Sequence, residues 1–179
     1  MFVLLGTQNK GSADARHADK PSLVFAELKN ADAMEQIVFL AQRAHEESRF
    51  SHITFAPQKV QAIADRALSD PKRHGIMVAW FGEKPVGAVY CSVGEYYIGT
   101  GSLITTIHNI NVLKEVRYGL RGGRVALGLL RGVETWSLAR SSTEVLFHST
   151  SGVGLERTHK LIKRLGYRFI GGSYAKDVN

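Results

Sequence analysis

The sequence contains little cysteine and little proline, with one cysteine, Cys91, and four prolines in 179 residues. A single thiol excludes an internal disulfide framework and a cysteine-rich metal site. The seven histidines are scattered and form no His-x-x-x-His pair, so we expect no metal. No apolar run approaches the roughly 20 residues of a membrane helix, and Met1–Leu5 is too short for a signal-peptide core. These absences predict a cytoplasmic protein that does not bind a membrane.

Acidic residues are fewer than basic ones, 16 against 23, and the net charge is +7. Basic chains attract polyanions such as nucleic acid, anionic surfaces and phosphate-rich cofactors, and charge alone does not choose among them. Basic residues are concentrated after residue 114. This concentration is consistent with a solvated basic face or with a site for an anionic ligand in the C-terminal half.

The length of the chain suits one domain with one core. Residues 1–20 are expected to form a mobile N-terminal arm, because most of them are polar and show no apolar period. Residues 21–179 are expected to form the domain. Hydrophobic residues make up 44% and charged residues 22% of the chain, which is typical of a globular protein.

Apolar periodicity predicts a mixed α/β fold. A helix capped by Asn30 or Asp32 is expected to end near residues 45–47. The element order is β-α-α-β-β-β-α-β-α-β, which favours a mixed central sheet covered by helices on both faces. Strands are expected at residues 22–28, 75–80, 85–92, 103–113, 144–149 and 167–175, and further helices at 57–68, 124–140 and 155–165.

The turn Arg121-Gly122-Gly123-Arg124 precedes a long amphipathic helix and is typical of a phosphate site. The first N–H groups of a helix lack partners within the helix, and the helix dipole places positive potential there. Glycine lets a phosphate approach the backbone, and arginines add charge and forked donors. These features suit a pyrophosphate, although two glycines can also simply make a tight turn. The P-loop ending and the dinucleotide-binding glycine pattern are both missing.

Two segments and the element order resemble the GNAT N-acetyltransferase superfamily over most of residues 22–176. Residues 116–130 are similar to the family's acetyl-CoA loop, an Arg/Gln-x-x-Gly-x-Gly/Ala pattern before a leucine-rich helix, and residues 158–167 are similar to its last helix, which ends in Gly-Phe. The resemblance implies the GNAT fold, acetyl-CoA as co-substrate, and no metal. It also implies that the cofactor contacts Glu115, Val116, Arg121, Gly122, Gly123, Arg124, Val125, Ala126 and Ser149.

Three features depart from the family pattern. Arg124 stands where the pattern has its first glycine, and a shifted register at residues 117–122 places Leu120 there instead. Ile162 stands where many members carry the tyrosine that protonates the leaving thiolate. The end of the chain at Asn179 indicates that the family's final strand is missing or displaced, which would leave a sheet edge for pairing in a homodimer.

The candidates for acid–base catalysis are His108, His159 and Tyr167. The pKa range of His108 suits a general base near neutral pH, but this residue could equally be a hydrogen-bonded core histidine. His159 lies one helical turn before Ile162 and either takes the place of the missing acid or lies on the surface. Tyr167 either serves as the acid or replaces the family's core phenylalanine. Cys91, in an apolar strand, is expected to be a buried small residue rather than a nucleophile.

The resemblance implies an acetyl-CoA-dependent N-acetyltransferase that transfers the acetyl group directly to a primary amine. The acceptor, a small molecule or a protein, is not identified by the sequence. A GNAT-like binding module without catalysis is the alternative, because the family tyrosine is missing. A nucleic-acid-binding protein is a third hypothesis, based on the charge of +7, but no series of stacking aromatic residues accompanies the basic ones.

Overall fold

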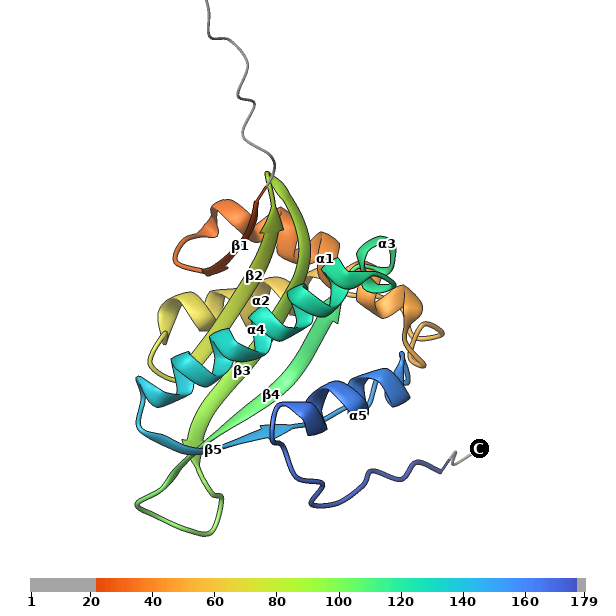
Figure 1. Ribbon diagram of the computed structural model, residues 1–179. Coiled ribbons are helices and arrows are strands. Elements are labelled where there is room, and N and C mark those ends of the chain that lie inside the picture. Colours follow the sequence, from red (N-terminus) through yellow and green to blue (C-terminus); the bar gives the residue numbers. More distant parts are fainter. Residues whose placement is uncertain (1–21, 177–179) are drawn as a thin grey trace, which may run out of the picture.

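The computed structural model describes residues 22–176, which form a five-stranded sheet with helices on both faces (Figure 1). The first four strands pair antiparallel, and the fifth pairs parallel to the fourth. This mixed sheet confirms the predicted α/β class, while the predicted arm at residues 1–20 lies outside the described residues. In their order across the sheet the strands are β1 (Leu23–Glu27), β2 (His74–Phe81), β3 (Lys84–Glu95), β4 (Leu103–Val112) and β5 (Ser142–Phe147).

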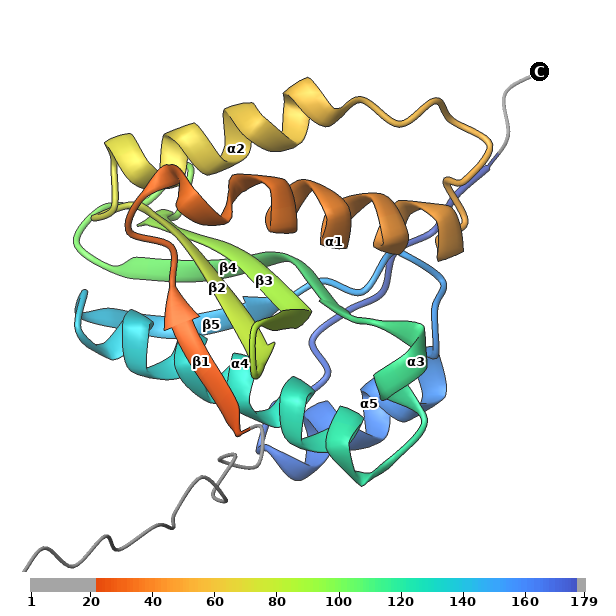
Figure 2. The same cartoon turned by 90° about the horizontal axis from the view of Figure 1, so that it is seen from above.

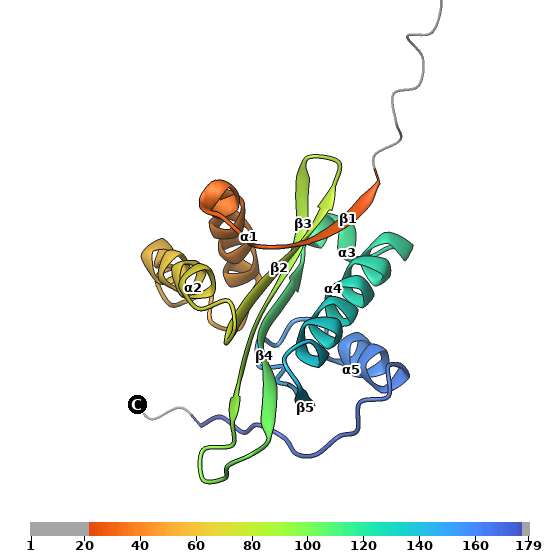
Figure 3. The ribbon, with the colours of Figure 1, turned by 90° about the vertical axis from the view of Figure 1, so that its left-hand side faces the viewer.

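Two pairs of helices cover the two faces of the sheet (Figures 2 and 3). One face carries α1 (Met34–Glu47) and α2 (Pro57–Ser69), and the other carries α4 (Leu120–Leu138) and α5 (Leu155–Arg164). Two shorter elements are η1 (Ala31–Ala33) and α3 (Lys114–Arg117). In the described part of the chain, none of the helices has the length and apolar character needed to cross a membrane.

The core has two halves, one on each face of the sheet. Successive side chains of a strand point to opposite faces, so Ile76 and Val78 of β2 pack under α1 and α2, while Met77 and Ala79 pack under α4. Burial on both faces explains why β2 is a continuous apolar run without polar alternation. The sheet is therefore a rigid middle layer, and functional side chains can occupy only its ends and its open edges.

α4 lies close to the sheet because small residues face the strands. A Cβ atom at Gly132 would lie 2.8 Å from Met77 Sδ, and one at Gly128 would overlap the Phe25 ring. Cys91 is fully buried under this helix, and burial raises the pKa of its thiol to about 12. A thiol with such a pKa is a poor nucleophile at neutral pH, which supports the predicted structural role.

The predicted last strand, residues 167–175, is wrong. After α5 the chain turns at Gly166, whose φ is 88°, and residues 167–176 form no strand. Phe169 and its neighbour Ile170 are both exposed, so the segment has no alternating apolar face to bury, and Gly171 and Gly172 weaken strand formation further. Within the described residues, β5 is therefore the last strand of the sheet.

A polar cluster links the C-terminal part of α4 to the edge strand β1. The indole N–H of Trp136 donates to the Glu27 carboxylate at 3.0 Å, and the Arg140 guanidinium stacks 3.8 Å from the Trp136 ring centre. Arg140 also lies 3.6 Å from the Glu27 carboxylate. The Trp136 side chain is almost fully buried, so its N–H depends on this one acceptor.

We predict that Trp136→Phe lowers the free energy of unfolding by about 2–3 kcal/mol, because a charged acceptor loses its buried donor. Urea denaturation gives this free energy. Trp80→Phe is the matched control, because Trp80 is half-buried and no hydrogen bond of its indole is found among the described residues. Equal losses for the two variants would contradict a role for the Glu27 hydrogen bond.

Candidate functional site

β4 and the edge strand β5 separate about halfway along β4 (Figure 1). Their pairing begins at Leu103 and Ser142 and ends at Ile107 and Phe147, whereas β4 continues to Val112. Over residues 109–112, β4 pairs with β3 alone among the described strands. Backbone groups on one side of β4 are therefore free to bind a ligand at the point where the two strands separate.

The separation is bridged on the α1 side by the loop that follows α1. The backbone N–H of Arg49 donates to the carbonyl of Ser151 at 2.9 Å, which ties this loop to the segment after β5. The Asn111 amide donates to the carbonyl of Leu40 in α1 at 3.5 Å. The end of α1, the outer half of β4 and the segment after β5 thus surround one region.

Arg117 fixes the far end of this region. Its guanidinium contacts the Glu47 carboxylate at 2.6 Å and donates to the carbonyl of Val112 at 2.7 Å and to the Asn111 side chain at 3.3 Å. The ion pair is only 18% and 21% exposed on its two sides. Arg117 therefore joins α1, the end of β4 and α3, and this role was not predicted from the sequence.

α4 begins at Leu120, four residues earlier than the sequence predicted. Gly119 is the N-cap residue, and among the described residues no acceptor is found for the N–H groups of Leu120, Arg121 and Gly122. Gly123 N–H donates to the Gly119 carbonyl at 3.4 Å, so from Gly123 onward the backbone donors are used within the helix. The free donors and the positive end of the helix dipole face the connection from β4.

The earlier helix start has a local cause. α3 turns the chain just after β4, and Gly122 lies against its backbone, because a Cβ atom there would be 2.5 Å from the Val116 carbonyl oxygen and 2.6 Å from Arg117 Cα. Gly123 faces open space. The two adjacent glycines therefore differ: Gly122 permits the close approach of α3 and α4, and Gly123 leaves the helix end accessible.

The side chains of the predicted pyrophosphate segment point in different directions. The Arg121 guanidinium stacks 4.0 Å from the Phe81 ring centre, and Arg124 is exposed. Val125 is fully buried in the core, and Ala126 packs against the core. The backbone at the start of α4 is therefore a better candidate for the phosphate contact than the side chains of Val125 and Ala126.

The two residues predicted to face pantetheine lie in α3. The Glu115 carboxylate is 3.4 Å from the Arg43 guanidinium of α1, and backbone hydrogen bonding followed by Arg43 lowers its pKa. Val116 is half-buried against the core below α4. Glu115 thus points toward α1, and Val116 packs against the core residues that α4 buries.

Arg157 was not singled out from the sequence, and it lies beside the start of α4. Its guanidinium is 5.1 Å from the ring centre of Tyr118, which directly precedes the N-cap Gly119. Arg157 is on the first turns of α5 and is exposed. The only sequence signal for it was the general concentration of basic residues after residue 114, which does not distinguish Arg157 from its neighbours.

His108 is the extra residue of a β-bulge. Tyr90 of β3 pairs with Asn109 and Cys91 with Ile107, so His108 has no partner in β3. Bulges re-aim side chains and are frequent next to active sites. The bulge turns the imidazole toward the face that carries α1 and α2, where its ring stacks on Tyr90 at 5.0 Å between centres.

The His108 imidazole has one polar partner, Ser92, and one aromatic neighbour, Tyr90, among the described contacts. Its Nε2 lies 2.7 Å from the Ser92 hydroxyl, and Tyr90 in turn lies 3.1 Å from His74 Nδ1 through its own hydroxyl. Burial against the sheet, followed by the nearby His148 and His74, lowers the pKa of His108 below its ordinary value of 6.5. A neutral imidazole at neutral pH can accept a proton, so the geometry is compatible with the predicted general base.

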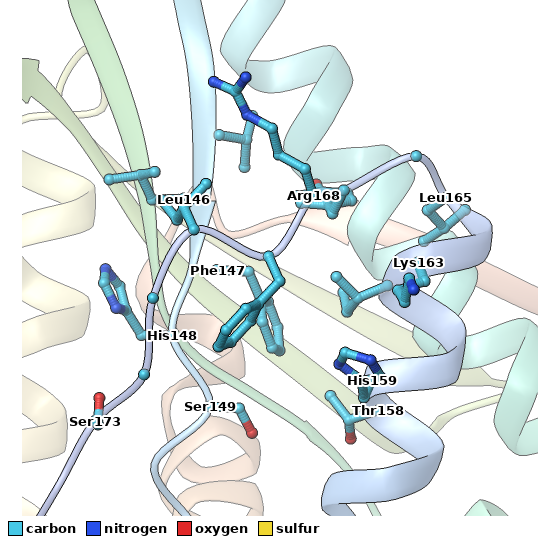
Figure 4. A pocket seen from close by; sticks show the side chains of 18 of the residues that line it. Leu146, Phe147, His148, Ser149, Thr158, His159, Lys163, Leu165, Arg168 and Ser173 are labelled. Carbon is cyan, nitrogen blue, oxygen red and sulfur yellow. The ribbon is translucent and has the colours of Figure 1, made fainter.

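His159, Tyr167 and Ser149 are brought together elsewhere. They line a cavity of about 810 Å³ between β5, α5 and residues 166–173, together with His148 (Figure 4). The Tyr167 hydroxyl is buried without a hydrogen-bond partner among the described residues, and burial followed by the Glu134 carboxylate raises its pKa above the ordinary value. α5 lies beside α4, so His159 and Tyr167 are on the opposite side of the sheet from His108 (Figure 3).

The described residues contain no group of histidine, cysteine, aspartate or glutamate side chains that could hold a metal ion.

Solved acetyltransferases share this architecture. The aminoglycoside acetyltransferase AAC(6')-Iy, bound to a CoA bisubstrate analog, is similar with a TM-score of 0.68 and 14% identity over 88% of this chain and 99% of that chain. A ribosomal-protein-alanine N-acetyltransferase from Brucella melitensis biovar Abortus 2308 gives 0.62 and 16% over 88% and 100%.

An aminoglycoside acetyltransferase from an uncultured soil metagenomic sample, in complex with sisomicin, gives a TM-score of 0.58 and 15% identity over 87% of this chain and 97% of that chain. The chain has the GNAT acetyltransferase fold. No family model matches the sequence, and no curated protein matches it. The fold assignment therefore depends on the three-dimensional likeness, which agrees with the resemblance seen in the sequence.

The paired glycines allow a test of the helix start. We predict that Gly122→Ala lowers the free energy of unfolding by about 1–3 kcal/mol, because its methyl group would overlap the α3 backbone. Gly123→Ala should raise the free energy of unfolding by up to about 1 kcal/mol, since alanine favours a helix and this position is open. Urea denaturation of both variants gives the two values. A change of the same sign in the free energy of unfolding of both variants would contradict the helix start at Leu120.

Proposed function

We propose that the protein is an acetyl-CoA-dependent N-acetyltransferase that acts on a primary amine. The observation that supports it most is the combination of a strand pair that separates after Ile107 and Phe147 with unpartnered backbone donors at Leu120–Gly122. The first offers backbone groups to an extended arm, and the second offers an anion site to a pyrophosphate. AAC(6')-Iy, which has the same fold, is described in complex with CoA.

The start of α4 would hold the pyrophosphate. The N–H groups of Leu120, Arg121 and Gly122 would donate to phosphate oxygens, and the exposed guanidinium of Arg124 would add charge one turn further along the helix. Arg157, which reaches this helix end from α5, would contact a second anionic group of the cofactor. Glu115, Val116 and Ser149, on either side of the strand separation, are the proposed neighbours of the pantetheine arm.

We predict that acetyl-CoA binds the wild-type protein and that Arg124→Ala with Arg157→Ala weakens binding at least about tenfold. Loss of an exposed arginine that contacts a phosphate costs of the order of 1 kcal/mol of binding free energy. Isothermal titration calorimetry measures the dissociation constants. Arg131→Ala is the matched control, because Arg131 is also an exposed arginine of α4 but lies two turns beyond Arg124.

No heat of binding with the wild-type protein would contradict the proposed function. Equal weakening by Arg131→Ala would show that net charge alone, rather than the helix end, governs binding. Binding without turnover on any amine would favour the alternative of a binding module that has lost catalysis.

His108 is the proposed general base. If its Nε2–H donates to the Ser92 hydroxyl, Nδ1 carries the lone pair that accepts a proton. Acetyl-CoA would supply the activated acetyl group as a thioester. The amine nitrogen of the acceptor would form the bond to the acetyl carbon as the carbon–sulfur bond breaks, the amine proton would pass to His108, and the products would be the amide and CoA.

The leaving thiolate needs a proton, and His159 and Tyr167 are the proposed donors. Both line the cavity beside β5, as Ser149 does, so a thiolate that leaves on this side of the sheet would meet them. The Tyr167 hydroxyl is protonated at neutral pH, although burial raises its pKa and so makes it a weaker proton donor than an ordinary tyrosine. His159 lies in the helical turn before Ile162, at the edge of the same cavity.

We predict that kcat/KM falls as the pH drops through an apparent pKa below 6.5, because protonation of His108 removes the base. His108→Gln should lower kcat about 100-fold and abolish this acidic limb. A thiol-release assay between pH 5 and 9 measures both. His159→Gln and Tyr167→Phe are compared in the same assay, and loss of the true acid should lower kcat while leaving the acidic limb in place.

An acidic limb that persists in His108→Gln would contradict His108 as the base. His52→Gln is the control, because His52 is an exposed histidine of the loop after α1 whose imidazole contacts only the Arg49 carbonyl among the described hydrogen bonds.

The remaining predictions concern assembly and location. In the described part of the chain no strand pairs with the outer edge of β5. This open edge supports the proposal of a homodimer formed there. A contact of the basic C-terminal half with a polyanion and a cytoplasmic location also stay predictions from the sequence.

A further inference from the structure

The carboxylates at the C-terminal end of α1 are already matched by basic groups. Glu46 lies 2.9 Å from the Arg43 guanidinium, Glu115 lies 3.4 Å from the same group, and Glu47 lies 2.6 Å from Arg117. Lys114 adds a further positive charge beside Glu115. Three acidic and three basic side chains therefore balance each other, and this end of α1 offers no surplus negative charge to a ligand.

The groups around the proposed base are imidazoles and arginines. The nearest ionisable neighbours of His108 are His148 and His74, which together with burial lower its pKa. Further along the same face, Arg66, Arg73 and Asp70 surround His74, with two positive charges against one negative. An incoming ammonium group would therefore meet neutral or positive potential beside His108 rather than negative potential.

Arg49 stands where the loop after α1 meets the segment after β5. Its backbone N–H is bound to the Ser151 carbonyl at 2.9 Å, three residues beyond His148, so the backbone position is fixed. The guanidinium lies 5.2 Å from the Phe50 ring centre and is exposed. No carboxylate of residues 22–176 forms a salt bridge with it. Arg49 is thus a cation on a fixed backbone, with its charge available to a ligand.

We propose that the acceptor carries a negatively charged group close to its amine, and that Arg49 binds this group. The inference rests on the proposed acetyltransferase function and names its acceptor class. A carboxylate held by Arg49 would orient the amine toward the strand separation, and a polycation such as an aminoglycoside would be repelled by the same charge. The chain would then differ in acceptor from the fold neighbours that are named for aminoglycosides.

Three tripeptide amides of equal length test the acceptor charge: Ala-Glu-Glu, Ala-Gln-Gln and Ala-Arg-Arg. The only primary amine of each is that of the terminal alanine, so mainly the neighbouring charge differs. We expect kcat/KM to fall in that order, by about fivefold or more between the first and the last, and the difference to shrink as salt is raised from 20 to about 500 mM. Free L-glutamate and sisomicin complete the panel.

Substitution of Arg49 assigns the preference to this residue. Arg49→Gln should remove most of the difference between the peptides, and Arg49→Glu should reverse their order. Arg131→Glu is the matched control, because it makes the same change in net charge at an exposed position of α4 and should leave the order unchanged. The saturating rate per active site with the glutamine peptide checks that the variants stay folded and active.

Each outcome decides the proposal. Equal rates for the three peptides, faster acetylation of the arginine peptide or of sisomicin, or no turnover of any anionic amine by a protein that binds acetyl-CoA would each overturn it. A preference that also disappears in Arg131→Glu would overturn the role of Arg49. Failure to bind acetyl-CoA would instead contradict the acetyltransferase function itself. Turnover of glutamate alone would identify a free amino acid, and turnover of the glutamate peptide would identify a peptide terminus.

Discussion

The ion pair between Arg117 and Glu47 is the contact on which the geometry of the site depends. The same guanidinium also donates to the Val112 carbonyl and the Asn111 side chain, so it closes the outer end of β4 and holds α1 over it. Arg117 belongs to α3, against whose backbone Gly122 packs at the start of α4. The free backbone donors at Leu120–Gly122 thus lie next to a half-buried charge pair whose partners are 70 residues apart in sequence.

Much of the fold could be predicted from periodicity alone. The first five strands carry alternating or continuous apolar runs. Apolar residues recur at helical spacing in α1, with Ile37 and Leu40, and in α4, with Val133. These local patterns supply the residues that are buried in the core. The start of α4 could not be predicted, because α3 and the Arg117 anchor depend on contacts with α1. The expected last strand failed for a similar reason: local β-propensity in Tyr167–Ile170 has no sheet edge pairing to support it.

The candidate site was predicted in part. His108 was selected from its strand, but the bulge that re-aims it arises from pairing with Tyr90 and Cys91 and has no local sequence signal. Arg157 was missed because its meaning comes only from its contact with Tyr118 before α4. The rigid sheet between the two helix layers separates His108 from His159 and Tyr167, so one transferred group can meet both only where β4 and β5 separate.

Because the sheet separates the two helix layers, the charged residues on its two faces have different proposed roles. The arginines at the start of α4 and on α5 are the proposed partners of the cofactor's phosphates, and positive charge of this kind is common to phosphate sites. No cofactor phosphate is proposed on the α1 side. The negative charge of the glutamates there is balanced by Arg43, Arg117 and Lys114. Among the described salt bridges Arg49 takes no part, so in our proposal it supplies the positive charge that an acceptor meets on this side. A fold shared with enzymes named for aminoglycosides can therefore select acceptors of opposite charge, because the sheet fixes the reaction geometry and the α1 side sets the electrostatics.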